Sequence, residues 1–128
     1  MLEEGRVLGM ETIFVIDDSA TNLAVVSEML KNEYRTLTMP SAEKMFYLLE
    51  RITPKVILLD VEMPDMDGYE AIQILKENEK YKDIPVVFLT GNDDDETRDK
   101  CLSYGAAEII TKPFQKELLA DLLKRYVN

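Results

Sequence analysis

Residues 55–68 read KVILLDVEMPDMDG and hold the strongest structural signal in the chain. The apolar run 56–59 shows no polar alternation and ends on Asp60, a pattern typical of a strand buried on both faces of a parallel sheet. Asp67 and Glu70 have the spacing of a capping box, which predicts that a helix begins there. The stretch therefore predicts a strand, a loop and a helix in that order.

Four further segments have strand character, so this unit repeats along the chain. The five predicted strands are 12–17, 34–39, 55–60, 84–90 and 108–112. Segment 34–39 is the more polar one, which is consistent with an edge strand. A helical segment separates each strand from the next, and such intervals are too long for hairpin turns. Five βα units in a row predict a doubly wound α/β domain, a three-layer sandwich whose parallel sheet binds ligands at the carboxyl ends of its strands.

Apolar residues at helical spacing predict the buried faces of three helices. The stripes are Leu23, Val26 and Leu30 in one helix, Tyr69, Ile72 and Leu75 in another, and Leu118, Leu119, Leu122, Leu123 and Tyr126 in the last. The acidic run 93–96 precedes or opens the fourth helix, where the helix dipole favours negative charge. Pro113 is expected near the start of the fifth helix.

The composition excludes several classes of function. The chain has 128 residues, a net charge of −10, one Cys and no His. It therefore cannot supply a Ser-His-Asp triad, a Cys-His pair, a histidine-ligated zinc site or an internal disulfide. The negative charge argues against direct binding to nucleic acid or to anionic membranes, and no apolar run approaches the ~20 residues of a membrane helix. We expect one cytoplasmic domain over residues 11–128, preceded by a flexible leader over residues 1–10.

Five polar side chains fall at the ends of the predicted strands, namely Asp17, Asp18, Asp60, Thr90 and Lys112. Each of them alone is more simply explained as a turn or cap residue, but their joint placement favours a functional site, because a parallel sheet brings these ends to one edge. Neighbouring carboxylates repel each other unless a cation lies between them, and oxygen ligands suit Mg²⁺ best. With Lys112 and a cation to neutralise phosphoryl oxygens, one carboxylate could form an aspartyl phosphate.

Other phosphate-binding signatures are missing from the sequence. The first strand is not followed by a GxGxxG fingerprint, and the chain has no GxxxxGK[ST] loop, which argues against dinucleotide and P-loop sites. Haloacid-dehalogenase-like phosphatases place Asp-x-Asp after the first strand. Here residues 17–19 read DDS, which breaks that pattern.

Four motifs occur in a fixed order, namely VIDDS (15–19), ILLDVEMPDMDG (57–68), FLTG (88–91) and TKPF (111–114). Together they make the chain resemble a receiver domain of the two-component response regulators over about residues 11–126. The resemblance implies a flavodoxin-like fold with five helices and a five-stranded parallel sheet in the order 2-1-3-4-5. It also implies a phosphorylation-activated signalling switch rather than an enzyme that turns over a separate substrate.

The resemblance assigns roles in phosphoryl transfer to three residues. Asp60 corresponds to the phosphoacceptor, which takes its phosphoryl group from a phosphohistidine of a sensor histidine kinase or a histidine phosphotransfer protein. Thr90 corresponds to the switch hydroxyl, and Lys112 pairs with a phosphoryl oxygen. The Lys112–Pro113 bond is expected to be cis. The histidine that this chain lacks would therefore belong to its partner.

The resemblance also implies a Mg²⁺ site. Asp18 and Asp60 would bind the ion directly, Asp17 through a metal-bound water, and Glu62 through its backbone carbonyl. Glu62 and Asn92 lie two residues beyond Asp60 and Thr90, and we expect them to set the lifetime of the phosphorylated state. The output is expected on the face formed by the fourth helix, the fifth strand and the fifth helix, through a downstream domain or protein, and a homodimer is left open.

One position departs from the pattern. Receiver domains often carry Tyr or Phe three residues before the lysine, as a rotating partner of the switch hydroxyl, and here that residue is Ile109. Tyr104 is the alternative aromatic, although a half-buried surface tyrosine is its simpler interpretation. Two other functions stay open at this point: a Mg²⁺-dependent phosphatase for small molecules, and an interaction module of the same fold that is not phosphorylated.

Overall fold

The computed structural model describes residues 10–127, so the predicted leader lies outside the described residues except for Met10. Strands and helices alternate along the chain. They are β1 (Thr12–Ile16), α1 (Ala20–Leu30), β2 (Arg35–Met39), α2 (Ala42–Leu49), β3 (Val56–Asp60), α3 (Gly68–Glu77), β4 (Val86–Thr90), α4 (Asp95–Ser103), β5 (Glu108–Thr111) and α5 (Lys116–Val127). Within this range, none of the helices is long and apolar enough to cross a membrane.

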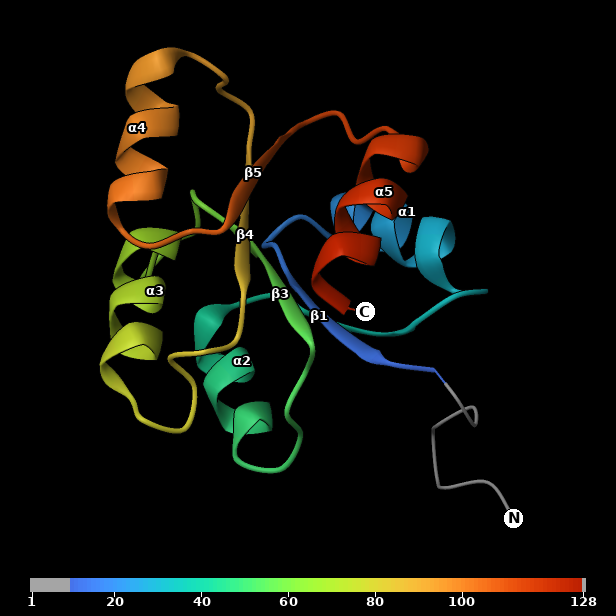
Figure 1. Ribbon diagram of the computed structural model, residues 1–128, viewed down its shortest axis with the longest axis horizontal. Helices are drawn as coiled ribbons and strands as arrows, with labels where there is room; N and C mark the ends of the chain where they lie inside the picture. Colours follow the sequence, from blue (N-terminus) through green and yellow to red (C-terminus); the bar gives the residue numbers. More distant parts are fainter. Residues whose placement is uncertain (1–9, 128) are drawn as a thin grey trace.

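The five strands form one parallel sheet in the order β2-β1-β3-β4-β5. Helices α1 and α5 cover one face, and α2, α3 and α4 cover the other (Figure 1). This is the flavodoxin-like three-layer sandwich expected from the sequence, and the expected edge position of the polar strand β2 is confirmed. Each observed strand is one or two residues shorter than its predicted segment.

Both faces of the three central strands are buried, which explains their uninterrupted apolar runs. One face packs against α2, α3 and α4 through Phe14, Ile16, Ile57, Leu59, Val86 and Phe88. The other packs against α1 and α5 through Ile13, Val15, Val56, Leu58, Val87 and Leu89. Because the strands are held from both sides, their carboxyl ends are rigid supports for any site built there.

The helix ends follow the sequence signals, whereas one residue of a predicted buried stripe does not. The capping box of Asp67 and Glu70 opens α3, and Asp94 caps α4 through the Thr97 amide at 2.8 Å. The fifth helix begins at Lys116, so Pro113 lies near its start, as expected. The prediction that Leu118 belongs to the buried stripe of α5 is wrong: its side chain is 61% exposed. The buried stripe runs through Leu119, Leu122 and Leu123, and Leu118 lies about 100° away from Leu119 around the helix axis.

Gly68 begins α3 where the helix passes directly over the end of β3. An added Cβ would lie 2.5 Å from the Asp60 carbonyl oxygen and 2.9 Å from both the Val61 Cα and the Phe88 ring. Two of these three neighbours are backbone atoms, so relief would require the strand end to move. The close approach, rather than an unusual backbone angle, therefore requires glycine at this position.

We expect Gly68→Ala to lower the free energy of unfolding by about 2 kcal/mol, because overpacking of a buried contact costs about that much. Gly91→Ala is the matched control, since an added Cβ there would meet no atom within 4 Å. Urea unfolding of both variants provides the measurement. An equal loss in the two variants would contradict the steric explanation.

Candidate functional site

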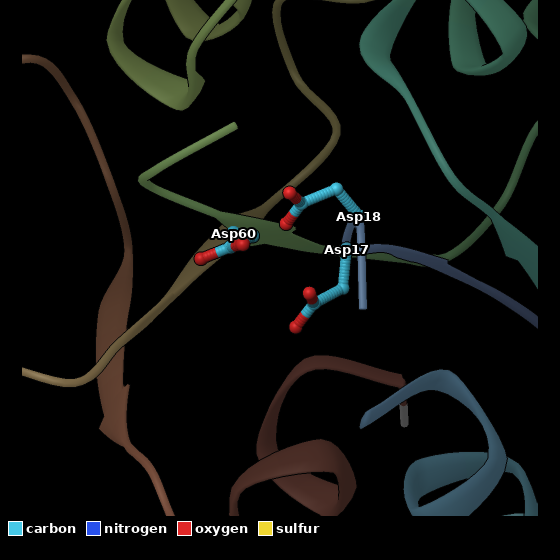
Figure 2. Close-up of side chains that lie close together, drawn as sticks. All are labelled: Asp17, Asp18 and Asp60. Carbon is cyan, nitrogen blue, oxygen red and sulfur yellow. The ribbon is translucent and has the colours of Figure 1, made fainter. Parts of the chain in front are cut away.

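Three carboxylates converge at the carboxyl edge of the sheet. Asp17 and Asp18 follow β1, and Asp60 ends the neighbouring strand β3, whose Leu59 pairs with Ile16. One oxygen of each carboxylate lies within 4.8 Å of the others. Figure 2 shows the three side chains at the ends of their strands. Asp17 and Asp60 are buried, whereas Asp18 is exposed. The sheet therefore presents two buried carboxylates and one solvent-facing carboxylate at a single point.

Asp17 is held by three neighbouring groups. Its Oδ1 atom accepts a hydrogen bond from the Ser19 amide at 2.9 Å, and its Oδ2 atom accepts one from the Asn22 side chain at 3.1 Å. The Lys112 Nζ atom also lies 3.1 Å from Oδ2. The sequence did not predict the contact of Asn22 with Asp17, because nothing in the first turn of α1 indicates which polar side chain turns back toward the strand. Asp17 is thus a well-oriented member of the cluster.

Lys112 reaches the cluster from the end of β5. Its Nζ atom bridges Asp17 Oδ2 and Asp60 Oδ1, each at 3.1 Å. Its backbone amide donates to the Thr90 carbonyl at 2.8 Å, and the following bond to Pro113 is cis, as expected. Burial alone would lower the pKa of Lys112, but the hydrogen bonds and charges of the two aspartates outweigh it and raise that pKa. The ammonium therefore stays charged.

Asp60 carries the perturbed carboxylate of the site. Burial, followed by repulsion from Asp17, raises its pKa from 3.8 to about 6, against the opposing effects of Lys112 and the Glu62 amide. Over residues 10–127, both hydrogen bonds to this carboxylate fall on Oδ1, from Lys112 at 3.1 Å and from the Glu62 amide at 3.4 Å. The Oδ2 atom of Asp60 therefore remains available to bind a cation or to act as a nucleophile.

These residues fit a Mg²⁺ ion. The cluster offers only oxygen ligands, two of its carboxylates are desolvated, and the repulsion that raises the pKa of Asp60 would be relieved by a cation. Magnesium also needs a site that leaves room for several waters, and the exposed Asp18 supplies an open side. The donor chemistry thus agrees with the ion expected from the sequence.

Thr90 ends β4 and is buried, and its hydroxyl belongs to a short chain of hydrogen bonds. Its Oγ1 atom accepts from the Asn92 amide at 3.1 Å and donates to the Asn92 carbonyl at 3.3 Å. The Asn92 side chain accepts from the Asp94 amide at 3.0 Å, and Asp94 in turn caps α4. The hydroxyl is therefore connected, through the loop, to the first turn of α4.

A cavity of about 670 Å³ opens beside the cluster and extends toward α4. Asp18, Glu62, Thr90 and Asn92 contribute to its wall at the sheet edge, and the same wall includes Tyr69, Thr97 and Lys100. Sequence reasoning placed Tyr69 only in the core stripe of α3 and did not single out Lys100. Their proximity depends on how α3 and α4 pack, which no local pattern reveals.

The aromatic residues near the site gather between α3, β4 and α4 rather than at position 109. Ile109 packs as a half-buried member of the core beside α4. Tyr104 ends α4 and packs against Tyr69, with ring centroids 4.9 Å apart, and Tyr69 meets the edge of Phe88 at 5.5 Å. Tyr104 is half-buried, in agreement with its simpler interpretation.

Residues 13–124 match the response regulator receiver domain family. The chain belongs to this family. It is 36% identical over 117 residues to a probable cyclic di-GMP phosphodiesterase of Vibrio cholerae, covering 91% of this chain and 26% of that protein. It is 30% identical over 122 residues to a two-component response regulator of rice, Oryza sativa, covering 94% and 91% of the two chains.

A solved structure supports the same assignment. The receiver domain of a sensor histidine kinase from Pseudomonas aeruginosa, with a magnesium ion coordinated in its active-site cleft, matches at a TM-score of 0.85 and 28% identity. The match covers 93% of this chain and 98% of that one. This receiver domain therefore shares its fold with proteins of two-component signalling, in which receiver domains act with histidine kinases. Because the chain spans only 26% of the phosphodiesterase, that protein's activity is not transferred.

The raised pKa of Asp60 predicts how stability depends on pH. Between 3.8 and about 6 the folded protein binds more protons than the unfolded chain, so the stability of the metal-free receiver domain falls as pH rises through this window. We expect Asp60→Asn to raise the free energy of unfolding at neutral pH by about 1–3 kcal/mol, and to lose this advantage near pH 4.

Urea unfolding in EDTA measures this effect, and exposed Asp83→Asn is the matched control for charge. Mg²⁺ is expected to stabilise the wild type more than the Asp60 variant, because the ion binds the folded state. A less stable Asp60→Asn protein at neutral pH would show that the ion pair with Lys112 outweighs the repulsion.

Proposed function

We propose that Asp60 accepts a phosphoryl group from a phosphohistidine of a sensor histidine kinase or a histidine phosphotransfer protein. The observation that carries this proposal is the desolvated Asp60 carboxylate. Lys112 binds its Oδ1 atom, so the Oδ2 atom is the one that can attack phosphorus. An Asp60 oxygen would form the new bond to phosphorus, the N–P bond of the phosphohistidine would break, and the imidazole would leave with the electron pair. Lys112 would neutralise one phosphoryl oxygen.

The acidic cluster would hold Mg²⁺ in the same reaction. Asp18 and Asp60 would bind the ion directly, Glu62 through its backbone carbonyl, and Asp17 through a water. The ion would supply charge neutralisation for the phosphoryl oxygens. Asp17 would keep Lys112 and the Asn22 side chain in place, as its hydrogen bonds indicate.

Thr90 would carry the signal away from the site. Its hydroxyl now bonds to the Asn92 backbone, and turning toward a phosphoryl oxygen would break those bonds and release the loop that leads into α4. An output partner would then bind the face of α4, β5 and α5, where a groove of about 500 Å³ is lined by Arg98, Ile109 and the exposed Leu118, among others. A change at Thr90 would thus reach this face through α4.

The same site supports the alternatives less well. A Mg²⁺-dependent phosphatase would show steady release of phosphate from a small substrate, whereas we propose that this domain only assists its own phosphorylation and dephosphorylation. An interaction module without phosphorylation would not need the buried Asp17, Asp60 and Lys112 cluster, which costs desolvation energy. The cytoplasmic location stays a prediction, and a homodimer stays open.

Asp60-dependent phosphorylation has a direct test. Incubation with acetyl phosphate and Mg²⁺ should add to the wild type one labile phosphoryl group that is lost in both acid and base, measured by intact-protein mass, because an acyl phosphate forms. Asp60→Asn should gain none, and Asp83→Asn should behave as the wild type. A stable phosphate on Ser or Thr, or a gain of mass in Asp60→Asn, would contradict the proposal.

The lifetime of the phosphorylated state tests the roles of Glu62 and Asn92, which line the cavity beside the site. We expect the double substitution Glu62→Gln, Asn92→Ala to change the dephosphorylation rate by more than about threefold, a barrier change of more than about 0.6 kcal/mol. Decay of the phosphorylated mass after donor removal gives the rate. An unchanged rate would assign both residues to structure alone.

A further inference from the structure

The cavity beside Asp60 has an uneven distribution of charge. Its wall carries the carboxylates of Asp18, Glu62, Asp67 and Glu96, and Lys100 is its one basic side chain among the described residues. Lys112 does not line this cavity, and its ammonium is paired with Asp17 and Asp60. A donor entering through the cavity therefore meets mainly negative charge on a chain whose net charge is −10.

Lys100 is held in this wall although its side chain is exposed. Its Nζ atom lies 4.2 Å from the centroid of the Tyr69 ring, within the range of a cation–π contact. The ring itself is fixed by Phe88 and Tyr104, and its hydroxyl lies 3.7 Å from the Cys101 Sγ atom. The ammonium is thus positioned on the cavity wall by a ring that cannot easily move.

We propose that Lys100 recognises the phosphodonor, by attracting dianionic acyl phosphates into the cavity and favouring them over less negative donors. The inference rests on the proposed function of Asp60. A cation facing the cavity lowers the free energy of a dianion more than that of a monoanion, and it offsets the repulsion of Glu96 one helical turn away. Tyr69 acts as a positioning residue for the ammonium.

Two phosphodonors of different charge can distinguish the effect of Lys100, and both transfer a phosphoryl group to Asp60 in the same type of displacement. With acetyl phosphate, an Asp60 oxygen bonds to phosphorus, the bond from phosphorus to the acetyl oxygen breaks, and acetate leaves with the electron pair. With phosphoramidate, whose nitrogen is protonated, the N–P bond breaks and ammonia leaves with the electron pair. Acetyl phosphate is a dianion near neutral pH and protonated phosphoramidate a monoanion, so Lys100 is expected to favour the first.

The test measures the second-order rate constant of phosphorylation of the full chain with each donor, in Mg²⁺, by intact-protein mass. At low ionic strength, Lys100→Gln should lower the constant for acetyl phosphate by about threefold to tenfold, and lower that for phosphoramidate by less. Glu96→Gln should raise the first constant, and Lys100→Arg should keep it near the wild-type value. All of these differences should shrink in about 1 M salt, where screening is strong.

Lys55→Gln is the matched control, because it removes the same charge from an exposed position at the opposite end of β3. It should leave both constants unchanged. An unchanged constant in Lys100→Gln, or an equal loss with both donors that persists in high salt, would overturn the role of Lys100 while wild-type phosphorylation still supports Asp60. A wild type that gains no phosphoryl group from either donor would instead overturn the proposed function, and this inference with it.

Discussion

The geometry of this receiver domain depends on two buried carboxylates, Asp17 and Asp60, being held next to each other at the ends of neighbouring strands. Burial and mutual repulsion make this arrangement unfavourable, as the raised pKa of Asp60 records, and Lys112 compensates for only part of it. The strands cannot separate to relieve the repulsion, because both of their faces are packed against helices. The fold therefore maintains a site that favours the arrival of a cation.

The elements around the cluster hold Asp17 and Asp60 in this arrangement. Asn22 at the start of α1 and the Ser19 amide orient Asp17, so the carboxylate does not rotate away from Lys112. Gly68 lets α3 start against the backbone of Asp60, which fixes the strand end from the other side. On the side of α4, hydrogen bonds of Thr90 and Asn92 run through the loop to Asp94, so a change at Thr90 can reach α4.

The surroundings of the acidic cluster are uneven in charge. The Lys112 ammonium contacts Asp17 and Asp60, whereas the cavity beside the cluster has a mostly acidic wall that carries Lys100 over the Tyr69 ring. Ile109 occupies the position where the family often has a mobile aromatic, and the aromatic rings gather instead between α3, β4 and α4. Only a few acidic residues of the chain form the site, and most of the others lie on the solvent-exposed surface.

The sequence by itself determined the order of elements, the parallel sheet and the gathering of Asp17, Asp18, Asp60, Thr90 and Lys112 at one edge. These follow from local periodicity and from the rule that parallel strands end together. Only the tertiary structure decided which oxygen each partner binds, that Leu118 faces solvent, and that Lys100 lies over Tyr69. Those features depend on how far each helix is rotated about its axis and on how helices from distant parts of the chain pack, which hydrophobic spacing does not specify.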